Sequence, residues 1–187
     1  MEPFEYVSVL TSLILGLGIT QLLTGVADLI LSHKKIKFFI PHSLWVLNVF
    51  GFQIQEWWYN YEYSRRIGIW HMSDFFFLVT YPIILFVMAR LMFPVTLAGG
   101  WVDLKSFYFK NFRKIFFVAV FLPIISIPQN IIISGRSFID ELPKVGFGLI
   151  LLYATISGTE NKYFHYAFSI IGIVIALSYL LFYDPAL

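Results

Sequence analysis

Seven polar residues lie within otherwise apolar stretches of this sequence and are its main candidates for chemistry. They are Gln21, Asn48, Gln53, Glu56, Arg90, Gln129 and Asn130. Carboxylate, guanidinium and amide groups bind ions and polar solutes, and they are costly to place in hydrocarbon. Glu56 is the acid nearest to the interior of such a stretch, so it is the strongest candidate for a proton-linked or cation-linked group. We therefore expect these seven residues to bind a substrate or an ion.

Other kinds of chemistry lack the residues that they need. The chain has no cysteine, which excludes disulfides, thiolate metal sites and cysteine nucleophiles. The four histidines are far apart in the sequence: His33, His42, His71 and His165. No two of them have the i, i+4 spacing of a helical metal site. The sequence has no nucleophile elbow, phosphate-binding loop or dinucleotide-binding glycine pattern. We assign no catalytic residue, no metal and no cofactor, and the net charge of +2 does not indicate nucleic acid.

The elements that must position these residues are membrane-spanning helices. Of the 187 residues, 59% are hydrophobic and 13% are charged, against about 25% charged in an ordinary soluble domain. A helix needs about 20 apolar residues to cross a bilayer. Six segments approach this length: 7–29, 38–58, 75–94, 114–134, 143–159 and 163–183. The sequence therefore predicts an all-α, polytopic transmembrane bundle, formed by one integral membrane domain over residues 1–187.

The segment 143–159 is the least secure of the six. It is short for a full crossing, so a tilted span, a re-entrant segment and a buried helix remain open, with five spans as the alternative. In the second segment Trp45, Asn48, Phe52 and Gln55 share one helical face. In the fourth segment Pro123 and Pro128 each remove a backbone donor. Broken helices of this kind form solute sites in transporters, although prolines also simply kink membrane helices.

The distribution of basic residues predicts the orientation. With six spans, eight lysines and arginines fall on one side: Lys34, Lys35, Lys37, Lys105, Lys110, Arg113, Lys114 and Lys162. Four fall on the other: Arg65, Arg66, Arg136 and Lys144. Because basic loops stay in the cytoplasm, both termini are expected outside it. We expect a bacterial cytoplasmic membrane, with a first helix that is not cleaved as a signal peptide.

Two groups of residues are candidates for contact with lipid. Trp57 and Trp58 begin an aromatic belt at the outer end of the second segment. The other group precedes the fourth segment: Trp101, Lys105, Lys110, Arg113 and Lys114. These residues predict a short interfacial helix on the cytoplasmic leaflet, capped by Asp103, whose apolar face (Leu104, Phe107, Tyr108 and Phe112) contacts lipid. Anionic lipids are the expected partners, and a docking surface for another protein is the alternative.

Two resemblances follow from particular residues. The segments 3–10 (PFEYVSVL) and 15–23 (LGLGITQLL), with Tyr81-Pro82, 89–91, 93–94 and the basic segment to 114, resemble small, uncharacterised bacterial multi-pass membrane proteins. This resemblance implies an integral membrane protein and no particular activity. Pro128-Gln129, with Thr20-Gln21 at the matching place of a 3+3 repeat, is similar to the motif of PQ-loop transporters. The first half lacks the proline, and the halves share little else.

Three functions remain open. The first is a transporter or channel for a small solute or ion, which requires the polar residues of the first, second and fourth segments to converge in the bundle. The second is a non-catalytic membrane scaffold or partner subunit that binds lipids, copies of itself or other membrane proteins. The third is an intramembrane lipid-modifying enzyme, for which only Glu56 and His42 are candidates, near opposite ends of one segment.

Overall fold

Six helices and two short strands make up the part of the chain that the computed structural model describes, residues 3–32, 35–94 and 101–182. The helices are α1 (Pro3–Leu31), α2 (Ile40–Arg66), α3 (Met72–Leu91), α4 (Leu104–Ile132), α5 (Phe138–Ser157) and α6 (Lys162–Phe182). The strands are β1 (Lys35–Lys37) and β2 (Trp101–Asp103). The all-α class is therefore confirmed, and each of the six expected segments corresponds to a helix.

Local sequence explains where several helices begin and end. Pro41 lies in the first turn of α2. Backbone N–H groups in the first turn have no acceptor within the helix, so the N–H that proline lacks costs no hydrogen bond there. Asp103 caps α4 as predicted, because its Oδ1 accepts a hydrogen bond from the Ser106 amide at 2.9 Å. Ser137 and Asp140 form a capping box at the start of α5. That helix ends at Gly158, whose φ of 62° is left-handed and therefore favours glycine.

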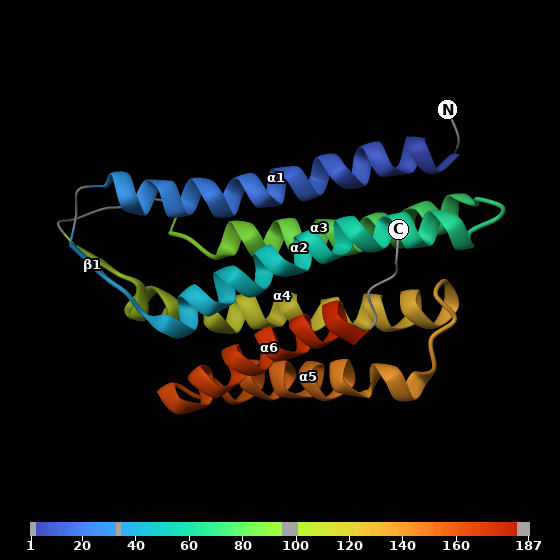
Figure 1. Ribbon diagram of the computed structural model, residues 1–187. Helices are drawn as coiled ribbons and strands as arrows, with labels where there is room; N and C mark the ends of the chain where they lie inside the picture. The colour runs from blue at the N-terminus through green and yellow to red at the C-terminus, as the bar shows by residue number, and fades with distance from the viewer. Residues whose placement is uncertain (1–2, 33–34, 95–100, 183–187) are drawn as a thin grey trace.

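Successive helices run in opposite directions along one common axis (Figure 1). α1 packs on α3 and α2, α3 packs on α4, α4 packs on α5, and α6 packs mainly on α2. β1 and β2 pair in parallel and join the α1–α2 connection to the α3–α4 connection, with Lys37 opposite Asp103. The Nζ atom of Lys37 lies 3.4 Å from Oδ2 of Asp103. These connections therefore lie at the same end, which we call the strand end.

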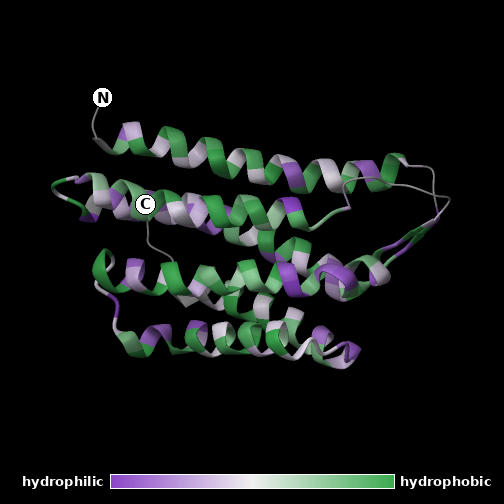
Figure 2. Cartoon of the chain, turned by 180° about the vertical axis from the view of Figure 1, so that it is seen from behind, coloured by the Kyte–Doolittle hydropathy of each residue, from purple (hydrophilic) through white to green (hydrophobic). Residues whose placement is uncertain are grey.

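The helices bury polar side chains and expose apolar ones. α2 alone buries six polar residues: His42, Asn48, Gln53, Glu56, Asn60 and Glu62. The exposed surface carries large hydrophobic side chains on several helices: Tyr6, Leu13, Ile30, Ile132, Ile139 and Ile156. Figure 2 shows hydrophobic residues along all the helices, whereas the strands combine hydrophilic and hydrophobic residues. Most of the rest of the interior is hydrophobic, so the informative features are these buried polar residues and the large apolar side chains at the surface.

Three described helices are long and apolar enough to cross a membrane by length and composition: Phe4–Leu31, Met72–Leu91 and Leu104–Ile132. The described part of α6 is also apolar but shorter, covering Lys162–Ser178. α2 has the required length, but its polar residues lower its hydropathy. Asn48, Gln53 and Glu56, in the middle of α2, are buried inside the bundle and do not reach its outer surface.

The segment expected to be a separate interfacial helix is the first part of α4. The helix continues without a break from Leu104 to Ile132. Leu104, Tyr108 and Phe112 are each 1% exposed, so the apolar face predicted to contact lipid packs in the core instead. The sequence pattern indicated the correct face but not what covers it, because lipid and a helix bundle favour the same apolar stripe.

Candidate functional site

A cavity of about 90 Å³ lies between α2, α3, α4, α5 and α6. Its polar lining comes from eight residues: Gln55, Glu56, Tyr59, Tyr63, Tyr81, Ser126, Asn130 and Lys144. Its remaining lining is mostly apolar and includes Trp45, Phe52, Pro123 and Phe147. Tyr63 lies near the end of α2, and Asn130 and Lys144 lie on either side of the α4–α5 connection. The cavity therefore occupies the half of the bundle away from the strand end.

Glu56 is the acidic residue in this lining. Glu56 is 4% exposed, and its Oε1 atom has no hydrogen-bond partner among the described residues. Asn60 donates to the backbone carbonyl of Glu56 at 2.9 Å, not to its carboxylate. A buried carboxyl oxygen without a donor is costly, so Glu56 offers an acceptor that a molecule in the cavity can satisfy.

A second acid, Glu141, is fully buried and has two partners, Asn130 and Lys144, which both line the cavity. The Nδ2 atom of Asn130 donates to Oε1 of Glu141 at 2.9 Å. The ammonium of Lys144 lies 3.0 Å from Oε2 of the same carboxylate. The hydroxyl of Tyr63 donates in turn to Oδ1 of Asn130 at 3.4 Å. This network links α2, α4 and α5 and compensates the charge of Glu141 inside the protein.

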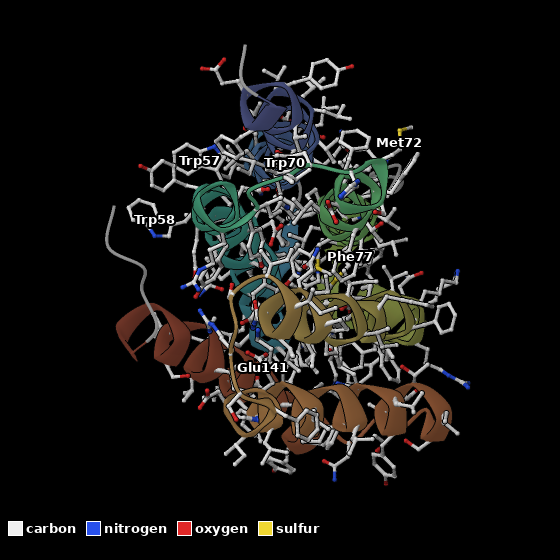
Figure 3. All side chains as sticks on the ribbon, turned by 90° about the vertical axis from the view of Figure 1, so that its right-hand side faces the viewer. Trp57, Trp58, Trp70, Met72, Phe77 and Glu141 are labelled. Atoms are coloured by element: carbon white, nitrogen blue, oxygen red, sulfur yellow. The ribbon has the colours of Figure 1, made fainter. Side chains whose placement is uncertain are left out.

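Charged residues surround the end of the bundle next to the cavity. The guanidinium of Arg136 lies 5.5 Å from the centre of the Tyr59 ring, within the range of a cation–π contact. Arg66 and Glu62 form an ion pair at 3.0 Å, one turn apart on α2. Figure 3 views the bundle from this end and shows Glu141 beside α4 and α5.

Aromatic rings fill the bundle between the cavity and the strand end. Trp45 lies 4.9 Å from Phe116 and 5.6 Å from Phe168, measured between ring centres. Beyond them, Nε2 of His165 lies 2.8 Å from the carbonyl oxygen of Thr159. A carbonyl only accepts, so Nε2 carries the proton and Nδ1 accepts the Tyr108 hydroxyl at 2.8 Å. The structure therefore closes the inner side of the cavity with packed rings.

The candidate binding residues do not converge on one cavity as the transporter hypothesis required. Glu56 and Asn130 line the central cavity. Gln21 and Arg90 line a separate cavity of about 290 Å³ between α1 and α3, toward the strand end. The other three candidates mediate contacts between helices. Two of the seven candidates, rather than all of them, thus belong to the central cavity.

Amide side chains join α2 and α4 to neighbouring helices. Asn48 donates from Nδ2 to the carbonyl of Ser169 in α6 at 3.1 Å. Gln129 donates from Nε2 to the carbonyl of Phe77 in α3 at 2.9 Å, and Figure 3 shows Phe77 between α3 and α4. Gln53 packs against Gly18 of α1, where an added Cβ atom would approach Oε1 of Gln53 to 2.7 Å. These residues hold helices together in the described structure.

The candidate lipid-contact residues differ in exposure. Trp57 and Trp101 are exposed, and Trp58 is half-buried. Trp57 and Trp58 both lie on the side of α2 away from α3 (Figure 3). Lys105, Lys110, Arg113 and Lys114 are exposed as well. Arg113, however, donates from Nε to the carbonyl of Thr155 at 2.9 Å and so satisfies a carbonyl in the last turn of α5.

Several residues of the cavity were missing from the candidates. Lys144 was counted as a loop charge, because it lies at the start of the weakest apolar segment. Tyr63 and Tyr81 carry no sequence pattern that distinguishes a cavity-lining tyrosine from the other aromatic residues of the chain. Three of the four residues on the predicted face of the second segment, Trp45, Phe52 and Gln55, do line the cavity. Periodicity was therefore informative within one helix, but it could not show which helices meet.

Comparisons of the chain with models of known protein families, with curated proteins and with solved structures gave no significant match. The class that the structure itself defines is an all-α bundle of six described helices, three of them long and apolar enough to cross a membrane. Its most distinctive internal feature is a cavity that contains an acid without a partner at one oxygen.

Proposed function

We propose that this chain is a multi-pass protein of a bacterial cytoplasmic membrane with six spans. The apolar outer surface and the buried polar residues support this proposal, because lipid favours the first and a helix bundle can shelter the second. The strand end carries most of the basic residues and is placed in the cytoplasm by the positive-inside rule. The α2–α3 and α4–α5 connections and both termini then lie outside.

Within this topology the protein is a transporter for a small solute whose binding site is the central cavity, with Glu56 and Asn130, and not the wider set of seven residues expected from the sequence. The observation that carries this proposal is the buried, unpaired Oε1 of Glu56 in a cavity between five helices. Binding sites between helices of a bundle commonly combine an apolar lining with a few polar groups. The packed rings on the strand side favour a transporter, which opens to one side at a time, over a continuously open channel.

An uptake assay tests transport even though the solute is unidentified. The full chain is reconstituted in liposomes, exposed to a mixture of amines, carboxylates, sugars and amino acids, and the contents are measured by mass spectrometry. At least one solute should accumulate above the level in protein-free liposomes. Ser126→Phe, which fills the cavity, should abolish this accumulation, whereas Ala167→Phe on the exposed face of α6 should not. Equal contents in all preparations would contradict transport.

The strand end supports a second function, binding of anionic lipid. Exposed basic residues at this end include Lys35, Lys105, Lys110, Lys114 and Lys162. The ammonium of Lys35 lies 5.2 Å from the ring centre of Trp101, so aromatic and basic groups lie together at the level expected for lipid headgroups. The triple change of Lys105, Lys110 and Lys114 to Gln should reduce the retention of phosphatidylglycerol in native mass spectrometry. Unchanged retention would exclude this lipid-binding role.

A further inference from the structure

The two buried acids beside the cavity differ in how their charge is compensated. Glu141 receives a hydrogen bond from Asn130 and an ion pair from Lys144 at 3.0 Å. Glu56 is buried as well, but no hydrogen-bond donor among the described residues reaches its Oε1 atom. Lys144, the basic residue of the lining, is thus ion-paired with Glu141, whereas Glu56 has only an electrostatic interaction with Lys144 and one oxygen that no described donor reaches. A positively charged guest is therefore favoured over a negatively charged one.

Aromatic rings form much of the remaining wall. Six of them line the cavity: Trp45, Phe52, Tyr59, Tyr63, Tyr81 and Phe147. A ring attracts a cation at its face, and the attraction is strongest when the cation is weakly hydrated. A metal ion would instead need several oxygen ligands in place of its water, and no group of three His, Asp or Glu residues in the described part of the chain comes together for this.

We infer that the central cavity binds a small organic cation, an amine or a quaternary ammonium, with Glu56 as its counter-charge and the aromatic rings as its cage. This inference rests on the proposed transport function and names the class of its substrate. An ammonium with alkyl groups satisfies both parts of the lining, because its charge pairs with the carboxylate and its alkyl groups contact the rings.

Three probes of nearly the same shape separate charge from size. The probes are choline, its uncharged isostere with a tert-butyl group in place of trimethylammonium, and the anion of tert-butylacetic acid. Binding is measured for the full chain in nanodiscs by the shift of the thermal unfolding midpoint with ligand concentration. Choline should raise the midpoint, and the other two probes should need at least roughly tenfold higher concentrations for the same shift.

The matched variants are Glu56→Gln and Glu160→Gln. Glu160 is exposed in the α5–α6 connection and does not line the cavity, so its change should leave choline binding as in the wild type. Glu56→Gln should lose the preference for choline over the uncharged isostere. The comparison of the three probes on the wild type remains decisive even where Glu56→Gln does not fold.

Each outcome separates this inference from the proposed function. Stronger binding of the anion or of the uncharged probe would overturn the cation assignment while leaving transport intact. A choline preference that survives Glu56→Gln would overturn the assignment of Glu56 as the counter-charge. If all three probes fail to bind, the inference holds only where the uptake assay identifies an amine or a quaternary ammonium as the solute. An anionic or neutral solute there also overturns the inference, and no solute at all contradicts the proposed function.

Discussion

The ammonium of Lys144 lies 3.0 Å from the carboxylate of Glu141, three residues earlier on α5, and this pair is held where α5 meets the central cavity. Lys144→Met should lower the free energy of unfolding by about 3 kcal/mol, because it leaves a buried carboxylate without its counter-charge. Thermal or chemical unfolding in detergent measures this loss. The double variant Glu141→Gln/Lys144→Met should regain part of it, and an equal or larger loss in the double variant would contradict a stabilising ion pair.

Glycines on α1 provide a matched pair for testing how this helix packs. A Cβ atom added at Gly25 would collide with the ring of Phe93, whereas one added at Gly16 would meet no atom within 4 Å. Gly25→Ala should therefore cost roughly 1–3 kcal/mol through overpacking. Gly16→Ala should be neutral or slightly stabilising, since alanine favours helix more than glycine. Equal unfolding midpoints for the two variants would show that α1 does not pack on α3 as described.

The hydrogen bond between Tyr108 and His165 helps to hold α4 against α6 on the strand side of the cavity. Tyr108→Phe keeps the ring but leaves Nδ1 of His165 without a donor, so it should lower stability by about 1–2 kcal/mol. Tyr153→Phe is the control, because Tyr153 is 60% exposed. The two variants are compared by their thermal unfolding midpoints, and similar values would count against a buried hydrogen bond at this place.

Asp103 makes the strand end sensitive to pH. The backbone amide of Ser106, and then Lys37, hold the pKa of this carboxyl below its usual value. Its contribution to stability is therefore present above the ordinary pKa of about 3.9 and is lost as the pH falls below it. Asp103→Asn keeps an N-cap but removes the charge, so it should be slightly less stable than the wild type at neutral pH.

The difference between wild type and Asp103→Asn should disappear in strongly acidic solution, where both side chains are neutral. Asp103→Ala also removes the cap, so its deficit should persist at both pH values. Unfolding midpoints of the three chains at neutral and acidic pH provide the measurement. A wild-type advantage over Asp103→Asn that grows on acidification would have the wrong sign.

The existence of the helices was predictable, but their contacts were not. Apolar length and capping residues such as Asp103 and Ser137 are local properties, so they can be read from the sequence. The environment of Glu56 depends on Lys144 and Asn130, which lie far along the chain and belong to other helices. The same limit explains why Gln53 and Gln129 were candidates for binding, since an amide that joins two helices and an amide that faces a cavity have the same sequence pattern.

Accessibility of Ser126 to water tests the central claim most directly, and the absence of cysteine from the chain makes the experiment clean. Ser126 lines the cavity, whereas Ala154 in α5 is fully buried away from it. Ser126→Cys should react with a membrane-impermeant, cationic methanethiosulfonate reagent added from the side opposite the strand end, and Ala154→Cys should not. If Ser126→Cys and Ala154→Cys are equally protected in the membrane and react only after denaturation, the cavity does not open to solvent and the proposed transport path is contradicted.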